Sequence, residues 1–115
     1  MTAYAIAHLT PGTLTEEVFV YIERMQATLD PFQGRFLVHG VRPEVLEGPW
    51  DGDIVLIGFP DIEAARAWYA SEGYQRILPL RTKNIPCTVA LLPGVPEGYD
   101  PAATAAAMRA ATTTG

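Results

Sequence analysis

The chain has 115 residues, of which 49% are hydrophobic and 18% charged, and its formal net charge is −5. This composition predicts one globular domain, and an acidic chain without a cluster of Lys and Arg does not suit nucleic-acid binding. No apolar run reaches the roughly 18 residues that span a bilayer, the N-terminus lacks a secretory signal, and a single cysteine allows no internal disulfide, so we expect a cytoplasmic protein that does not bind membranes.

The first forty residues predict a strand, a helix and a second strand. Residues 3–9, AYAIAHL, alternate small and larger side chains with the period of a strand. Thr13 and Glu16 have the spacing of a capping box and predict the start of a helix. Asp30-Pro31 predicts its end, because Pro disfavours helical geometry in the residue before it. Apolar residues at spacings of three and four predict the buried stripe of this helix, namely Leu14, Val18, Ile22, Met25 and Leu29.

The middle of the chain predicts two further strands. Residues 34–40, GRFLVHG, form the second strand, and residues 44–48, EVLEG, are expected to be its bent continuation. PWDGD at 49–53 has the composition of a turn. Residues 54–59, IVLIGF, are almost wholly apolar, which is typical of a strand buried on both faces.

The following segment predicts a helix, a break and a last strand. Asp61 is a plausible N-cap. The Ser-Glu-Gly stretch at 71–73 breaks the helix, and Pro79 limits a second piece of one or two turns. Residues 87–92, CTVALL, form the last strand. The inner face of the first helical piece comprises Ile62, Ala65, Trp68 and Tyr69.

This order, βαββαβ, predicts a ferredoxin-like α+β fold with an antiparallel four-stranded sheet of order 4-1-3-2 and two helices on one face. Two helices leave the other face bare, so we expect a homodimer that covers it. The domain should occupy residues 1–94. Residues 95–115 form an Ala/Thr-rich tail that is expected to be frayed or partly helical.

Three stretches resemble the DUF1330 family of the dimeric α+β barrel superfamily: GRFLVHG, VLEGPW and FPDIEAARAWYASEGYQRILPLR. The resemblance covers residues 3–94 and implies a barrel formed by the sheets of two copies. The superfamily includes cofactor-free monooxygenases, muconolactone-type isomerases and heme-binding members. Two positions depart from the family pattern, because members often carry Arg where His39 stands and an acidic residue where Gly58 stands.

Three polar residues are expected at one edge of the sheet. His8 and His39 end the first two strands, about 10 Å apart, and Asp53 leads into the strand between them. Three interpretations remain open: a divalent metal site, an acid–base site in which either histidine moves a proton, or polar strand ends that meet solvent. Strand parity leaves open whether the two histidines share a face.

Arginines and aromatic residues are the candidate ligand contacts. Arg35 and Arg81 can each hold a carboxylate or an enolate, or form an ordinary ion pair. The resemblance to cofactor-free monooxygenases implies that Trp68 and Tyr74, together with Tyr69, line a space between helix and sheet. The alternative is that these rings fill the core.

No cofactor is predicted. Both histidines lie within the first 39 residues, which does not suit heme, and no glycine-rich phosphate loop supports flavin or nicotinamide binding. Cys87 is interpreted as a core residue. The sequence predicts a homodimeric, cofactor-free enzyme that acts on a small aromatic or carboxylated metabolite as an isomerase, cyclase, hydrolase or monooxygenase, or else a non-catalytic small-molecule-binding or accessory protein.

Overall fold

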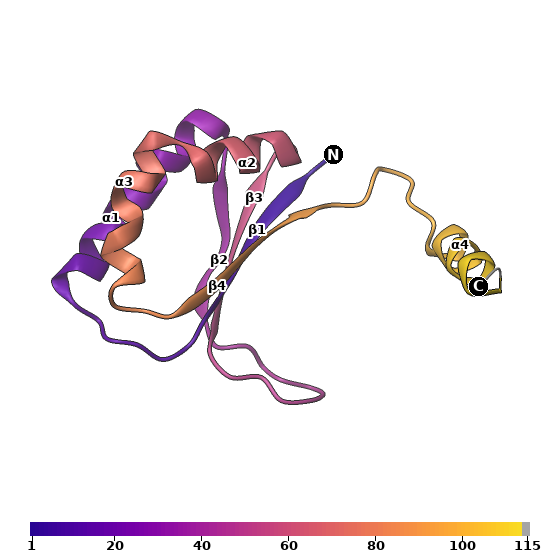
Figure 1. The fold of residues 1–115 in the computed structure, drawn as a ribbon, viewed down its shortest axis with the longest axis horizontal. Coiled ribbons are helices and arrows are strands. Elements are labelled where there is room, and N and C mark those ends of the chain that lie inside the picture. The colour runs from indigo at the N-terminus through magenta and orange to yellow at the C-terminus, as the bar shows by residue number, and fades with distance from the viewer. Residues whose placement is uncertain (114–115) are drawn as a thin grey trace.

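Four strands and four α-helices form the fold in the computed structural model, which describes residues 1–113 (Figure 1). The elements in chain order are β1 (Ala3–Leu9), α1 (Glu16–Leu29), the 3-10 helix η1 (Asp30–Phe32), β2 (Arg35–Val41), β3 (Asp53–Phe59), α2 (Ile62–Ala70), α3 (Glu72–Thr82), β4 (Cys87–Pro93) and α4 (Pro101–Thr113). Within this range, no helix is both long and apolar enough to cross a bilayer.

The sheet has the order β2-β3-β1-β4 with antiparallel pairs throughout. Helices α1, α2 and α3 lie together on one side of it (Figure 1). This arrangement confirms the predicted ferredoxin-like α+β fold and its strand order. No helix within residues 1–113 covers the other side of the sheet, which we call the open face.

The strand register decides which residues point toward the helices. Ala5 pairs with Ile57, and both are buried beneath the helices. The neighbouring pair, Tyr4 and Gly58, therefore lies on the open face because side chains alternate along a strand. β2 is irregular, with register shifts between Phe36 and Val38 and again between His39 and Val41. Each shift changes the face toward which the following residues point.

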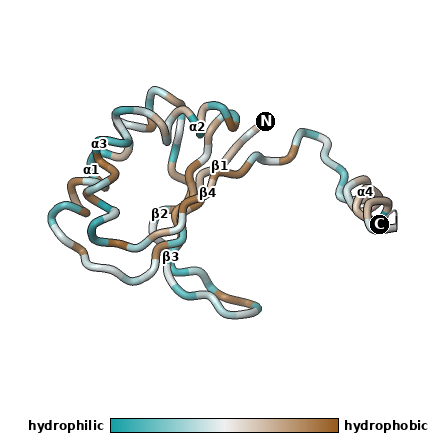
Figure 2. The backbone as a smooth tube through the Cα atoms, in the orientation of Figure 1, coloured by the Kyte–Doolittle hydropathy of each residue, from teal (hydrophilic) through white to brown (hydrophobic). Residues whose placement is uncertain are grey.

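The hydrophobic core lies between the helices and the sheet. Figure 2 shows hydrophobic residues along the central strands. Trp68, Tyr74, Leu29 and Val18 are the largest side chains that are almost fully buried. Burial of such side chains is the main force that holds the helices on the sheet, at about 1.5 to 3 kcal/mol for each large apolar residue.

Helix α1 differs from its prediction at its start and along its buried face. It begins at Glu16 with Thr15 as N-cap, so the capping box from Thr13 does not form. Leu14 lies before the helix and is exposed, as is Ile22. Tyr21 is buried in their place. The buried stripe is Val18, Tyr21, Met25 and Leu29, which keeps the spacing of three and four but is rotated on the helix.

The break between α2 and α3 was predicted, but the length of α3 was not. The Asp61 side chain accepts a hydrogen bond from the backbone N–H of Ala64, which confirms the predicted N-cap. Ser71 ends α2 and also caps α3, because its Oγ accepts from the N–H of Tyr74. The prediction that Pro79 limits this helix is wrong: Pro79 lies inside α3, which continues to Thr82.

Two connecting segments also differ from their predictions. Residues 42–52 form an irregular loop between β2 and β3, so EVLEG is not a strand (Figure 1). β2 ends at Val41, directly after a bulge in which Gly40 has positive φ, and Pro43 has no N–H to donate to a neighbouring strand. The tail contains the helix α4 where fraying was expected, with Asp100 accepting from the N–H of Ala102. Residues 101–112 are exposed except for the half-buried Thr104, and α4 stands away from the sheet.

Candidate functional site

A cavity of about 530 Å³ lies between the helices and the sheet. This volume is in the range of small-molecule sites, about 300 to 1,000 Å³. Its wall includes Ala5, Ala7, Val55 and Val89 from the sheet, and Val18 and Met25 from α1. One end is made by buried residues, and the other by exposed or half-buried residues at or near the strand ends. We call these the deep end (Tyr21, Trp68, Tyr74, Arg81) and the mouth (Thr10, Leu14, His39, Gly40, Arg42, Asp53).

Two tyrosines meet at the deep end. The hydroxyls of Tyr21 on α1 and Tyr74 on α3 are 2.8 Å apart and form a hydrogen bond. Both residues are buried, and their rings contact edge to face at 6.2 Å between centroids. Burial raises the pKa of Tyr21 above its ordinary value, with a further contribution from Tyr74, and burial also raises the pKa of Tyr74. Both phenols therefore stay protonated near neutral pH.

Arg81, in the last turn of α3, is the single buried charged residue in the described chain, and its exposed fraction is 7%. Its guanidinium lies 5.8 Å from the centre of the Tyr21 ring. Burial opposes its charge, but Tyr21, Tyr74 and Cys87 more than offset this effect, so the pKa of Arg81 is raised. The Cys87 thiol, at the start of β4, has a pKa raised by burial and partly lowered again by Arg81.

The other two predicted aromatic residues have different positions. Trp68 lines the cavity and packs 4.2 Å from the Tyr74 ring centre, yet its indole N–H is already used, since it donates to Thr28 Oγ1 at 3.0 Å. Trp68 can therefore present a ring surface to a ligand but no free donor. Tyr69 is half-buried behind Trp68 and is not part of the cavity wall.

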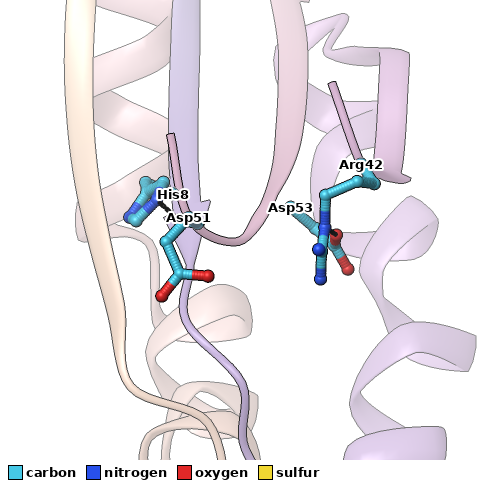
Figure 3. A network of polar contacts seen from close by, with 4 residues as sticks. All are labelled: His8, Arg42, Asp51 and Asp53. Atoms are coloured by element: carbon cyan, nitrogen blue, oxygen red, sulfur yellow. Dashed lines mark hydrogen bonds and ion pairs between the residues drawn. The ribbon is translucent and has the colours of Figure 1, made fainter. Parts of the chain in front are cut away.

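His39 and Asp53 lie at the mouth on the helix side of the sheet. His39 pairs with Val55 across the β2–β3 register, and its ring stacks on Phe36 at 4.3 Å. Asp53 accepts from the Arg42 guanidinium at 3.1 Å, an exposed ion pair that stabilises the fold by at most about 1 kcal/mol (Figure 3). Gly52, at positive φ, closes the loop against β1, where a Cβ would collide with the carbonyl of Leu9.

His8 is separated from these residues, which corrects the predicted cluster. It pairs with Ile54 and lies on the open face. Its Nε2–H donates to the backbone oxygen of Asp51 (Figure 3). The His8 ring also contacts Trp50 edge to face. The β2 bulge moves His39 to the opposite face, so His8, Asp53 and His39 do not form one site. Within residues 1–113, no three His, Cys, Asp or Glu side chains gather closely enough to hold a metal.

The two candidate arginines are also on opposite sides of the sheet. Arg35 pairs with Gly58 and lies on the open face, beside a hollow lined by Tyr4, Gln33 and Leu37. Arg81 lies under the helices in the cavity wall. One ligand in the cavity can therefore contact Arg81 but not Arg35 of the same chain.

Tyr21 and Arg42 are site residues that the sequence patterns missed. Tyr21 belongs to the buried stripe of α1, and the signal for it was present, since Val18, Tyr21 and Met25 are spaced by three and four residues. An alternative stripe through Ile22 fits the same spacing, so the pattern alone could not choose between them. Arg42 meets Asp53 only because β2 and β3 lie side by side, and no spacing along the chain indicates that contact.

Solved structures share this fold at low sequence identity. The RPA0582 protein of unknown function from Rhodopseudomonas palustris matches with a TM-score of 0.62 and 14% identity, covering 83% of this chain and 83% of that one. The cofactor-independent oxygenase SnoaB from Streptomyces nogalater matches with a TM-score of 0.57 and 16% identity, covering 86% and 98%. A dimeric ferredoxin-like protein of unknown function from Jannaschia sp. CCS1 matches with a TM-score of 0.56 and 18% identity, covering 82% and 100%. Such likeness supports the fold alone.

Comparison of the sequence with curated proteins finds no match. The model of the family described as "Domain of unknown function (DUF1330)" matches residues 2–95, which include all four strands and helices α1 to α3. Since this match covers most of the chain, the protein belongs to the DUF1330 family.

Proposed function

We propose that the protein is a homodimeric, cofactor-free enzyme that binds a small aromatic or carboxylated metabolite in the cavity between helices and sheet. The observation that carries this proposal is the cavity of about 530 Å³, whose wall is mainly apolar and whose polar groups gather at its two ends. Apolar walls with a few placed polar groups are typical of small-molecule sites. SnoaB, a cofactor-independent oxygenase, has the same fold and lends support by analogy.

The proposed chemistry divides between the two ends of the cavity. At the deep end, Arg81 and the two protonated phenols of Tyr21 and Tyr74 favour negative charge on an oxygen of the ligand. At the mouth, His39 is the proposed group that moves a proton, because histidine is the side chain that most often serves in general acid–base catalysis. Isomerisation, cyclisation, hydrolysis and oxygenation of an activated substrate all include such a step. Asp53 has no direct part in the proposed proton transfer, because its carboxylate is already paired with Arg42 at the mouth.

The remaining predicted site residues have other proposed roles. Trp68 is a contact for the ring of the ligand, and Tyr69 supports Trp68 from behind. Arg35 and His8 lie on the open face, where the second copy of the proposed dimer would pack. The dimeric ferredoxin-like protein from Jannaschia sp. is a precedent for such an assembly in this fold.

A non-catalytic binding protein is the second candidate, and one observation favours it. The deep end contains hydrogen-bond donors but no carboxylate or imidazole that could act as a base. His39 lies at the mouth, where its ring stacks on Phe36. The groups at the deep end are all protonated, so they can bind a ligand but cannot accept a proton from it. The two candidates differ in whether His39 matters for turnover.

A blocked cavity tests the proposal. Ala7 lines the cavity from the middle of β1, and Ala67 is exposed on α2 outside the cavity wall. We expect aromatic and carboxylated metabolites found in a thermal-shift screen to bind the wild type and Ala67→Leu but not Ala7→Leu. For a substrate so identified, His39→Ala should lower kcat by at least about 100-fold and leave binding nearly unchanged. If Ala7→Leu bound these metabolites as tightly as the wild type, the cavity would be refuted as the ligand site. If His39→Ala kept full turnover, the proposed role of His39 in proton transfer would be refuted.

A further inference from the structure

Arg81 is a buried cation without an anionic partner in the described chain. Its exposed fraction is 7%, and no carboxylate of residues 1–113 lies within ion-pair distance of it. The ion pairs in this range join other residues, namely Arg42 with Asp53, Arg76 with Glu72, and Lys83 with Glu17. A buried charge is costly unless it is paired, so this position requires an explanation.

The protein groups around Arg81 compensate its charge only in part. The face of the Tyr21 ring and the carbonyl end of α3 both carry partial negative charge and favour a cation. Neither supplies a full negative charge. The guanidinium has five N–H donors in a planar fork, which matches the two oxygens of a carboxylate.

The tyrosine pair adds a donor at the same place. One hydroxyl proton is used in the hydrogen bond between Tyr21 and Tyr74, and the other is left to donate elsewhere. The deep end therefore offers a guanidinium and a phenol O–H, while Trp68 offers a ring surface but has already used its N–H on Thr28. Such a set of donors favours an acceptor that carries negative charge.

The charge and the shape of the cavity limit the class of ligand further. The deep end has one positive charge, and the carboxylate nearest to the cavity, Asp53, is at the mouth and paired with Arg42. A second ligand charge would have to rest against the apolar wall formed by residues such as Ala5, Val18 and Val89. This wall suits a flat or compact hydrocarbon body.

We propose that the deep end of the cavity is a carboxylate subsite that binds a monocarboxylic acid with an aromatic or similarly apolar body, carboxylate innermost, on Arg81 and the Tyr21–Tyr74 pair. This inference rests on the proposed function, because it requires the cavity to be the ligand site. It adds the charge of the ligand, its orientation and the residue that selects it. Arg35 takes no part, since it lies on the other side of the sheet.

A matched pair of probes tests the subsite. 2-Naphthoate and 2-naphthamide have nearly the same size and shape but differ in charge. By titration calorimetry, we expect the wild type to bind naphthoate about 10- to 100-fold more tightly than naphthamide, as a charged hydrogen bond in a buried site implies. Arg81→Met should remove this preference while leaving naphthamide binding within about threefold. Arg35→Met is the matched control and should retain the full preference.

Each outcome decides the proposal. If both probes bind the wild type equally, if folded Arg81→Met keeps the preference, or if Arg35→Met removes it, the carboxylate subsite is refuted while the ligand cavity stands. If neither probe binds the wild type, the proposed cavity function fails and the subsite with it. Should Arg81→Met fail to fold, Arg81→Lys replaces it: the charge remains but the planar fork is lost, so the preference should fall by about threefold and persist. An unchanged preference in Arg81→Lys would contradict the bidentate contact.

Discussion

Tyr21 and Tyr74 lie 53 positions apart in sequence, yet their hydroxyls form a buried hydrogen bond beside Arg81. At the residue scale, this cluster is the main polar feature of the interior. Trp68 and Tyr74 fit the aromatic pattern of the sequence, and both are buried in the wall of the cavity. The same rings thus pack the core and border a space large enough for a ligand.

The hydroxyl pair makes a measurable contribution to stability. Tyr21→Phe leaves the Tyr74 hydroxyl buried without its partner, so we expect the free energy of unfolding to fall by about 1 to 2 kcal/mol. Urea denaturation measures this change. Tyr99→Phe is the control, because its hydroxyl bonds to Thr104 at the exposed tail, and its effect should stay within about 0.5 kcal/mol. Equal effects of the two substitutions would contradict the buried hydrogen bond.

The same tyrosines predict a loss of stability at alkaline pH. Burial raises the pKa of Tyr21 and of Tyr74 in the folded chain, whereas an unfolded tyrosine ionises near pH 10. Above about pH 10 the unfolded chain releases protons that the folded chain keeps, so stability that is complete below this pH declines as the pH rises. Urea denaturation from pH 8 to 11 should show a decline that is less steep in the double variant Tyr21→Phe/Tyr74→Phe. Parallel declines would show that other groups cause the loss.

At the element scale, local signals predicted most helix and strand positions. Asp61 and the Ser71 break are short-range devices that satisfy backbone N–H groups within a few residues. The incorrect predictions concern positions where the local signal was ambiguous or where tertiary packing outweighed it. Pro79 removes one backbone donor from α3, but Ile77 and Arg81 are buried on either side of it, and this packing holds the helix through the proline.

Two helix caps with the same chemistry should have unequal effects. Asp61→Ala removes the hydrogen bond to Ala64 N–H at the start of α2, which packs on the core, so the free energy of unfolding should fall by about 1 kcal/mol. Asp100→Ala removes the corresponding bond to Ala102 N–H of α4, which is exposed, so the unfolding midpoint should not change. Chemical denaturation followed by tryptophan fluorescence measures both. A lower midpoint for Asp100→Ala would show that α4 is coupled to the domain.

At the scale of the whole molecule, the sheet has one face under helices and one open face. Ile6, Leu37, Leu56 and Leu92 lie on the open face. Leu37 and Leu92 are 44% and 42% exposed, which is a cost in water that a second copy would remove. The proposed homodimer therefore has a physical reason in this surface.

A charge at the centre of the open face tests the dimer. Leu56 pairs with Ile6 on β1 and with Val38 on β2, in the middle of the sheet. We expect the wild type to sediment as a dimer at micromolar concentration and Leu56→Asp as a folded monomer, because the substitution buries an unpaired carboxylate in the interface. Phe19→Asp, on the exposed surface of α1, should remain a dimer. A monomeric wild type, or a dimeric Leu56→Asp, would refute the open-face interface.

The sequence by itself determined the order of elements, because this order depends on hydrophobic periodicity and short-range turn signals. The βαββαβ order then indicated the fold and its strand order, and three stretches of sequence resembled the family. It also singled out Arg81, Trp68 and Tyr74. Only the tertiary structure decided which residues share a site. A β-bulge in β2 put His39 and His8 on opposite faces, and a rotation of α1 brought Tyr21 to Tyr74. The bulge is a one-residue shift in strand register, and the rotation of α1 is a shift of about one residue around the helix. Packing between distant parts of the chain decides such shifts, whereas the local sequence does not.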